Sequence, residues 1–308
     1  MCSVYFLRTL NDRAAHDPEG FVAESEAAYD RRIRDAAARL REALPARPIL
    51  LLSGPSSVGK TTTADRLCRA LEGLGVGARR LSMDDYFLSR GSYSMPFDAE
   101  NGVPDLESPL CMDLPLLGDH LRRLAAGEEI ALPRFDFLTG QQTRDVTPIR
   151  RRPDELIIIE GIHALNDVIT GGLDGLATGV SLALDASVVC DDGLCFSPET
   201  LRFARRALRD ARFRGASVPD TIRQWRSVRR GERLYIAPYR HAAAFTIDTY
   251  LPYESCVLYP ALAEALTRNA DALRQAGLPE AVEAARRFAP LDPAPFLPAD
   301  SLLREFFG

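Results

Sequence analysis

The segment "ILLLSGPSSVGKTTT", residues 49–63, joins a continuous apolar run to a glycine-rich loop and then to the start of a helical pattern. A short apolar run that ends in glycine is typical of a strand buried in a parallel sheet. After the loop, apolar residues recur with helical spacing at Ala64, Leu67, Leu71 and Leu74. The loop fits the pattern GxxxxGK[ST], in which successive backbone N–H groups surround a phosphate group. The segment therefore predicts an α/β protein with a phosphate-binding loop between a strand and a helix.

Each residue type in this loop has a physical role. Glycine lets the backbone curl until its N–H groups face a phosphate, and the start of the helix adds the positive end of its dipole. Lys60 can reach the β- and γ-phosphates of a nucleotide, and Thr61 can offer its hydroxyl to Mg²⁺. The loop residues expected to bind the nucleotide are Gly54, Ser56, Ser57, Val58, Gly59, Lys60, Thr61 and Thr62.

Lys60 is the only lysine of the chain, because 37 of the 38 Lys and Arg residues are arginine. An ammonium group is compact, whereas a guanidinium group is wide and planar. A loop that wraps tightly around a phosphate therefore favours lysine at this position. The lack of a second lysine also excludes the guanine-reading NKxD signature, and with it a Ras-like GTPase.

The composition indicates a soluble globular protein, with 46% hydrophobic and 26% charged residues. A formal charge of −5 argues against nucleic acid as a partner, because such binding depends on neutralising phosphates. The six cysteines form no metal-binding or disulfide pattern, so we expect free thiols in a reducing cytoplasm. No apolar run approaches the length of a membrane-spanning helix, and we expect no membrane partner. The sequence leaves homo-oligomerisation open.

Strand-like and helix-like segments alternate along the chain, which indicates an α/β fold with a mostly parallel central sheet flanked by helices. The expected strands are 49–54, 78–83, 156–161, 180–185 and 244–251, and the expected helices are 24–43, 60–74, 112–127 and 198–211. Residues 84–112 are rich in glycine and proline and are expected to form loops. We expect an N-terminal extension with a helix over residues 1–45, followed by one domain over residues 46–308.

Acidic residues follow two of the expected strands. Glu160 ends the strand 156–161, and ligands of open α/β sheets bind at the carboxyl ends of strands. Glu160 could therefore hold Mg²⁺ together with Thr61. Asp84 and Asp85 follow the strand 78–83, where a carboxylate could take the proton of an attacking alcohol. Two adjacent acids could equally form a turn or a helix cap.

Arginine is concentrated in the C-terminal half of the chain. Residues 202–240 contain twelve arginines but only three acidic residues. Arg202, Arg205, Arg206 and Arg209 are spaced to share one helical face. Such a face is commonly a solvated surface, but an excess this large within an acidic protein suggests an anionic ligand. We expect an arginine-rich helical lid over roughly residues 198–233 that closes over a phosphoryl group and stabilises its charge.

With these residues in place, the chain resembles the uridine kinase-like P-loop kinases, which are relatives of phosphoribulokinase, and within them a bacterial branch. The resemblance runs from about Pro48 to Tyr250 and includes "GPSSVGKTT", "LSMDDYF", "DLESPLCMDLPLL", "LPRFDF", "LIIIEGIHAL" and "LRFARRALRDARFRG". It implies a P-loop kinase fold and phosphorylation of the 5′-hydroxyl of a nucleoside, with ATP and Mg²⁺ as cofactors.

The resemblance also implies roles for individual residues. The catalytic set would be Asp84 as the base with Lys60, Arg205 and Arg209, and Arg212 and Arg214 would contact ATP. The substrate-binding set would be Asp84, Tyr86, Glu107, Phe135, Phe137, His163 and Arg202, and the metal ligands would be Thr61 and Glu160. Glu107 stands where the family has an aspartate that binds the ribose hydroxyls.

The chain departs from the uridine kinase pattern where that pattern reads the base. Phe135 stands in the place of a tyrosine, and Gly140 stands in the place of a histidine. Phenylalanine can stack on a base but cannot form a hydrogen bond with it, and an apolar site discriminates weakly. The base preference therefore stays open.

Three functions fit the sequence. The first is a nucleoside kinase that uses ATP and Mg²⁺, and the second is a kinase for another small alcohol, such as a sugar phosphate or a pantothenate-like compound. The third is a nucleotide-binding regulator without transfer activity. Asp84 and the arginine-rich stretch argue against the third, since binding alone requires neither.

Overall fold

A computed structural model describes residues 3–44, 46–173 and 175–308 of the chain. Its centre is a five-stranded sheet in which every pair of neighbouring strands is parallel. The strands, in spatial order, are β12 (Phe245–Asp248), β9 (Ala177–Ala183), β2 (Ile49–Ser53), β8 (Glu155–Gly161) and β3 (Gly77–Ser82). The predicted α/β fold with a mostly parallel sheet is therefore confirmed, and the strand of the opening segment lies at its centre.

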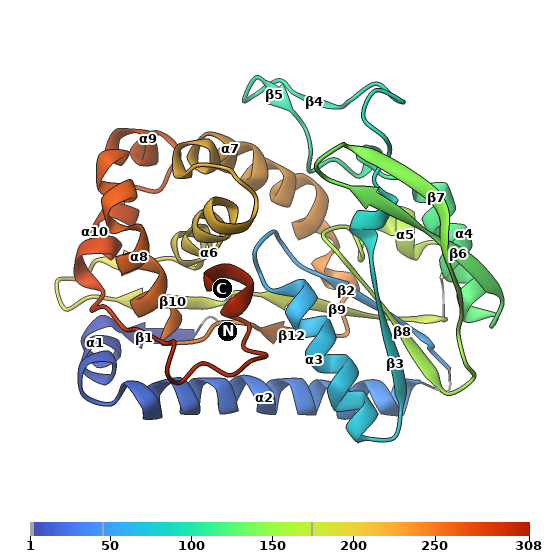
Figure 1. Ribbon diagram of the computed structural model, residues 1–308, viewed down its shortest axis with the longest axis horizontal. Helices are drawn as coiled ribbons and strands as arrows, with labels where there is room; N and C mark the ends of the chain where they lie inside the picture. The colour runs from blue at the N-terminus through green and yellow to red at the C-terminus, as the bar shows by residue number, and fades with distance from the viewer. Residues whose placement is uncertain (1–2, 45, 174) are drawn as a thin grey trace.

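The central strand β2 is buried on both faces of the sheet. Leu50 and Leu52 face one hydrophobic cluster, while Ile49 and Leu51 face another, as the alternation of side chains along a strand requires. The first cluster lies under α2 (Pro18–Ala43), α3 (Lys60–Gly73), α6 (Pro198–Phe213) and α8 (Glu254–Arg268), and the second under α4 (Leu114–Ala125) and α5 (Asp167–Thr170) (Figure 1). Helices therefore cover both faces, and ligands can reach the sheet at its carboxyl edge.

The predicted N-terminal helix is part of a larger unit. The chain begins with β1 (Ser3–Phe6) and α1 (Leu7–His16), and α2 starts at Pro18, where the Asp17 side chain accepts a hydrogen bond from the Gly20 N–H. β1 pairs with β10 (Ala186–Val189), which also pairs with β11 (Cys195–Phe196).

Helix α2 packs against α3, the helix that follows the phosphate-binding loop. The hydroxyls of Tyr29 and Thr63 lie 2.6 Å apart, and Arg66 forms a 3.0 Å ion pair with Glu26. Residues on both sides of the predicted boundary near residue 45 belong to one hydrophobic cluster.

The arginine-rich segment forms two helices, α6 and α7 (Val218–Gly231), followed by the helical turns η3 (Glu232–Ile236) and η4 (Ala237–Ala242). Ser197 caps α6, and Ser217 forms a capping box with Asp220 at the start of α7. Both helices contribute to the core, where the rings of Phe203 and Trp225 lie 5.2 Å apart.

Loops and hairpins lie beyond the carboxyl edge of β3. They comprise the 3-10 helices η1 (Met83–Tyr86) and η2 (Pro109–Cys111), the pair β4 (Phe97–Asp98) and β5 (Val103–Pro104), and the long hairpin of β6 (Glu129–Asp136) and β7 (Gln141–Arg150). The predicted loop over 84–112 is thus mostly irregular, whereas the β6–β7 hairpin was not predicted.

The chain ends in short helices, and the last of them lies near the centre of the molecule (Figure 1). These are α9 (Ala270–Gln275), α10 (Ala281–Arg287) and α11 (Arg304–Phe307). Within the ranges that the structure describes, no helix is long and apolar enough to cross a membrane.

Candidate active site

The phosphate-binding loop connects the end of β2 to α3 and depends on its glycines. Gly59 has φ = 89°, a left-handed conformation that favours glycine. A Cβ atom at Gly54 would lie 2.9 Å from the Leu182 carbonyl oxygen, so a side chain there would collide with β9. The local sequence therefore produces a tight loop whose N–H groups and helix start form an anion site.

A cavity of about 290 Å³ lies over this loop. The predicted site residues that line it are Ser56, Ser57, Gly59, Lys60, Thr61, Asp84, Glu107, Phe135, Phe137, Glu160, Arg209 and Arg214. Those that do not line it are Gly54, Val58, Thr62, Tyr86, His163, Arg202, Arg205 and Arg212. The structure thus brings together residues from the loop, both acidic strand ends, the β6–β7 hairpin and α6.

Lys60 lies among acidic neighbours. Its Nζ donates a 3.1 Å hydrogen bond to the Pro55 carbonyl oxygen. Burial lowers the pKa of Lys60, and the carboxylates of Glu160 and Asp84 oppose this effect. The ammonium group is therefore held over the loop, where an anionic ligand would favour its charged form.

Thr61 and Glu160 meet at the edge of the cavity. The Thr61 hydroxyl donates a 3.2 Å hydrogen bond to Glu160 Oε1, which also accepts one of 3.1 Å from Ser82. Burial raises the pKa of Glu160, and the charge of Lys60 opposes this effect. A hydroxyl and a carboxylate are oxygen ligands of the kind that Mg²⁺ accepts, so this pair fits the predicted metal position.

The adjacent acids Asp84 and Asp85 lie in different environments. Asp84 is exposed and lines the cavity, and its carboxylate forms no hydrogen bond or ion pair with any residue in the described ranges. Asp85 Oδ1 instead accepts a 3.4 Å hydrogen bond from the Phe135 N–H, and burial raises the pKa of Asp85. The structure therefore leaves Asp84 available to a ligand, while Asp85 holds the β6–β7 hairpin.

Arg205 does not reach the cavity. It is fully buried, and its guanidinium donates to both carboxylate oxygens of Glu254, at 2.8 and 2.7 Å, and to the Thr249 carbonyl oxygen at 2.7 Å. It also donates to the carbonyl oxygen of Val58, at 3.2 Å, from behind the loop. These contacts give Arg205 a structural position, because no donor is directed at the cavity.

Arg206 is one of the cavity residues that the sequence-based assignment missed. It lines the cavity, and its Nη1 donates a 2.7 Å hydrogen bond to Ser56 Oγ. Arg206 and Arg209 share one carboxylate, that of Asp210, at 3.3 and 3.1 Å. Burial lowers the pKa of both arginines. One carboxylate cannot neutralise both charges, so this part of the cavity is suited to an anion. The sequence could have indicated Arg206, because residues three apart in a helix lie on one face and Arg209 was already assigned to the site.

Other predicted arginines are engaged elsewhere. Arg202 pairs with Glu232 and donates a 2.9 Å hydrogen bond to the Ser56 carbonyl oxygen. Arg212 donates to the Phe307 carbonyl oxygen and stacks over the Phe307 ring. Both side chains therefore stabilise the surroundings of the loop without entering the cavity.

Glu107 projects an unsatisfied group into the site. Its Oε2 is buried and has no hydrogen-bond partner among the described residues. Burial raises the pKa of Glu107, and Arg206 opposes this effect. A Cβ atom at Gly231 would lie 2.3 Å from the Cβ of Glu107, so the glycine at the end of α7 lets the two segments touch. An unpaired buried acceptor is costly unless a ligand donates to it.

Two further residues predicted to bind substrate lie behind the cavity. The Tyr86 hydroxyl lies 3.0 Å from Nδ1 of His120, and both side chains are buried. His163 is also buried, and burial lowers its pKa to about 4. Neither side chain lines the cavity.

The C-terminal helix α11 also reaches the loop, which the sequence did not indicate. The Thr62 hydroxyl donates a 2.9 Å hydrogen bond to Glu305 Oε2, and Glu305 lines the cavity. A Cβ atom at Gly59 would lie 2.5 Å from Cδ1 of Leu302. A carboxylate therefore lies at the start of α3, beside the anion site.

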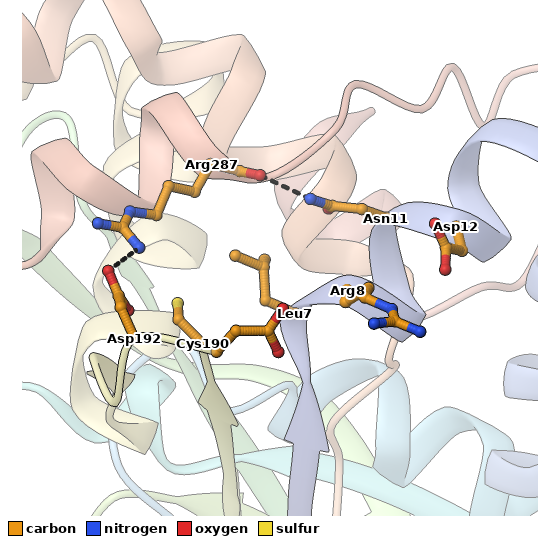
Figure 2. Close-up of a pocket in the computed structure, with 8 residues that line it drawn as sticks. Leu7, Arg8, Asn11, Asp12, Cys190, Asp192 and Arg287 are labelled. Carbon is orange, nitrogen blue, oxygen red and sulfur yellow. Dashed lines mark hydrogen bonds and ion pairs between the residues drawn. The ribbon is translucent and has the colours of Figure 1, made fainter.

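Figure 2 shows a second cavity, of about 540 Å³, whose lining residues are distant in sequence from the loop. Arg287 donates a 2.7 Å hydrogen bond to Asp192 across this cavity, and Asn11 donates one to the Arg287 carbonyl oxygen. Three of its polar lining residues, Asn11, Asp192 and Arg287, are thus linked by hydrogen bonds.

Comparison with known proteins shows the family of the chain. The model of the phosphoribulokinase / uridine kinase family matches residues 49–252, and the chain belongs to this family. It is a P-loop kinase, and the family makes it a phosphotransferase.

Named relatives are similar over more than half of the chain. A uridine kinase of Deinococcus deserti is 31% identical over 180 residues, which cover 58% of this chain and 76% of the relative. A uridine kinase of Staphylococcus aureus is 29% identical over 185 residues, which cover 60% of this chain and 79% of the relative. A solved structure of a possible uridine kinase from Bacillus stearothermophilus is 18% identical, covers 70% of this chain and 98% of its own, and has a TM-score of 0.43.

Proposed function

We propose that this chain is an ATP-dependent kinase that phosphorylates the 5′-hydroxyl of a nucleoside. The observation that carries the proposal is the content of one cavity, in which the phosphate-binding loop, the free carboxylate of Asp84 and the unpaired oxygen of Glu107 lie together. A phosphoryl donor, a proton acceptor and a group for vicinal hydroxyls are the parts that phosphorylation of a ribose requires.

Each of these groups has a distinct role in the proposed reaction. The loop N–H groups and Lys60 hold the phosphates, and Arg206 and Arg209 stabilise the charge of the phosphoryl group during transfer. Asp84 accepts the proton of the attacking hydroxyl. Glu107 accepts hydrogen bonds from the neighbouring ribose hydroxyls, which satisfies its buried oxygen.

We propose that Thr61 and Glu160 hold Mg²⁺. Within the described part of the chain, no group of three or more His, Cys, Asp or Glu side chains could hold a metal. Two oxygen ligands suit Mg²⁺ in kinases, because nucleotide phosphates and water complete its coordination. When bound, the ion neutralises charge on the phosphate oxygens.

A panel of acceptors tests this function. ADP release would be followed with ATP, Mg²⁺ and each of several nucleosides, sugar phosphates and pantothenate. We expect nucleosides to stimulate ADP release. Stimulation by another alcohol, without any response to nucleosides, would contradict the proposal.

Glu305→Gln is expected to lower the KM for ATP by about two- to fivefold. A negative charge at a helix N-terminus contributes about 0.3–1 kcal/mol, and the Glu305 carboxylate would compete with a phosphate for this position. Steady-state kinetics with varied ATP measure the effect. Glu264→Gln, on the exposed face of α8, is the matched control. An increase in the KM for ATP would show that Glu305 supports nucleotide binding.

We also propose that the protein acts in the cytoplasm. The five cysteines in the described ranges are free thiols, which supports a reducing compartment.

A further inference from the structure

Part of the lining of the cavity over the loop is formed by aromatic rings. Phe87 lies 5.6 Å from Phe135 and 5.9 Å from Phe137, and the last two rings are 5.1 Å apart, measured between centroids. All three residues line the cavity. Aromatic walls of this kind favour a planar ring in the ligand, against whose face they can pack.

Arg90 is fixed beside these rings by its backbone. Its N–H donates a 2.8 Å hydrogen bond to the Gly140 carbonyl oxygen, at the turn of the β6–β7 hairpin. The preceding residue, Ser89, accepts a 2.9 Å hydrogen bond at its Oγ from the N–H of Gln142. The segment that carries Arg90 is therefore tied to the hairpin that carries Phe135 and Phe137.

The side chain of Arg90 passes directly over Gly140. A Cβ atom at Gly140 would lie 2.4 Å from Cδ of Arg90 and 2.9 Å from its Nε. Gly140 also has φ = 67°, in the left-handed region. The missing side chain at position 140 therefore leaves the space that the Arg90 side chain uses to line the cavity.

The guanidinium of Arg90 has no partner of its own. Arg206, Arg209 and Arg214 each have the Asp210 carboxylate within 4.0 Å. In contrast, the Arg90 guanidinium forms no hydrogen bond or ion pair with any residue in the ranges described. Its five N–H groups can only donate, and they bind best to two neighbouring acceptors in one plane.

We propose that Arg90 determines acceptor specificity by donating two hydrogen bonds to the base of the nucleoside, and that cytidine is preferred to uridine. This inference rests on the proposed nucleoside kinase function. Cytosine presents N3 and O2 as adjacent acceptors in the plane of the ring. Uracil has an N–H donor at N3, which opposes a group that can only donate.

A carboxylate presents the same pair of acceptors. A small hydroxy acid could therefore use Arg90 as well, but it would leave the aromatic walls without a stacking partner. The rings of Phe87, Phe135 and Phe137 favour the planar base.

The test compares kcat/KM for cytidine, uridine and 3-deazacytidine, in which C–H replaces N3, with glycerate as the carboxylate arm. We expect wild-type protein to prefer cytidine to both other nucleosides by about tenfold or more, because a good bidentate arginine contact discriminates by this order. Arg90→Met should remove this preference by lowering the value for cytidine. Arg90→Lys keeps the charge but not the paired donors, and should also lose the preference.

Arg134→Met, on the same hairpin but outside the cavity, is the matched control and should retain the wild-type preference. Equal use of cytidine and uridine by wild-type protein, an unchanged preference in Arg90→Met, or faster phosphorylation of glycerate would each overturn the inference. If nucleosides are phosphorylated without a preference that depends on Arg90, only this inference fails. If no nucleoside is phosphorylated, the proposed function fails with it.

Discussion

Asp84→Asn is expected to lower kcat by about 10²–10⁴-fold, the range that general base catalysis contributes. The amide keeps the size of the carboxylate but cannot accept a proton from the attacking hydroxyl. The Asp84 carboxylate forms no hydrogen bond or ion pair with the rest of the described chain, so its replacement should leave the fold intact. Steady-state kinetics measure kcat, and equilibrium binding measures the affinity for ATP, which should change little.

Asp85→Asn is the matched control for this prediction. The Asp85 carboxylate accepts a hydrogen bond from the Phe135 N–H and therefore has a structural role. We expect its kcat to stay within about tenfold of the wild-type value, because the proton acceptor is retained. Wild-type turnover in Asp84→Asn would remove Asp84 as the base.

Replacing Arg206 should lower turnover, whereas replacing Arg205 should lower stability, although the two residues are adjacent. Arg206→Gln should lower kcat by about 10³-fold or more, because an arginine that stabilises the transferring phosphoryl group contributes at least this factor. Arg205→Gln should instead lower the free energy of unfolding by about 3–5 kcal/mol, because it leaves the buried Glu254 carboxylate without its partner.

Denaturant unfolding and kinetics on the same preparations distinguish these effects. The double variant Arg205→Met/Glu254→Leu removes both buried charges and should recover most of the lost stability. Normal stability with lost turnover in Arg205→Gln would contradict the structural role of Arg205, and normal turnover in Arg206→Gln would contradict the role of Arg206 in phosphoryl transfer.

The fold follows closely from local sequence. Residues 49–63 predict a buried strand, a tight loop and a helix, and the structure has β2, the loop and α3 in these places. The predicted strands at 49–54 and 156–161 agree with β2 and β8 because fully buried parallel strands are continuous apolar runs. The β6–β7 hairpin was missed because its strands, from Glu129 to Arg150, are rich in polar and charged residues.

The site is predicted less completely, because several contacts join distant parts of the chain. The ends of β2 and β8 adjoin in the sheet, so Thr61 and Glu160 could be paired from sequence. The contact of Thr62 with Glu305 spans 243 residues and has no local signal. Arg205 and Arg206 could not be separated, because the difference between them is the ion pair that Arg205 forms with Glu254, which lies 49 residues further along the chain in α8.

The central claim is that the cavity transfers a phosphoryl group from ATP to the 5′-hydroxyl of a nucleoside. The most direct test incubates wild-type protein with ATP, Mg²⁺ and cytidine, and identifies the product by chromatography against the 2′-, 3′- and 5′-monophosphates. We predict cytidine 5′-monophosphate in an amount equal to the ADP formed, and at least about a hundredfold less of it in the same time with Asp84→Asn. Formation of ADP without any nucleoside monophosphate, or phosphorylation at the 2′- or 3′-position, would contradict the account.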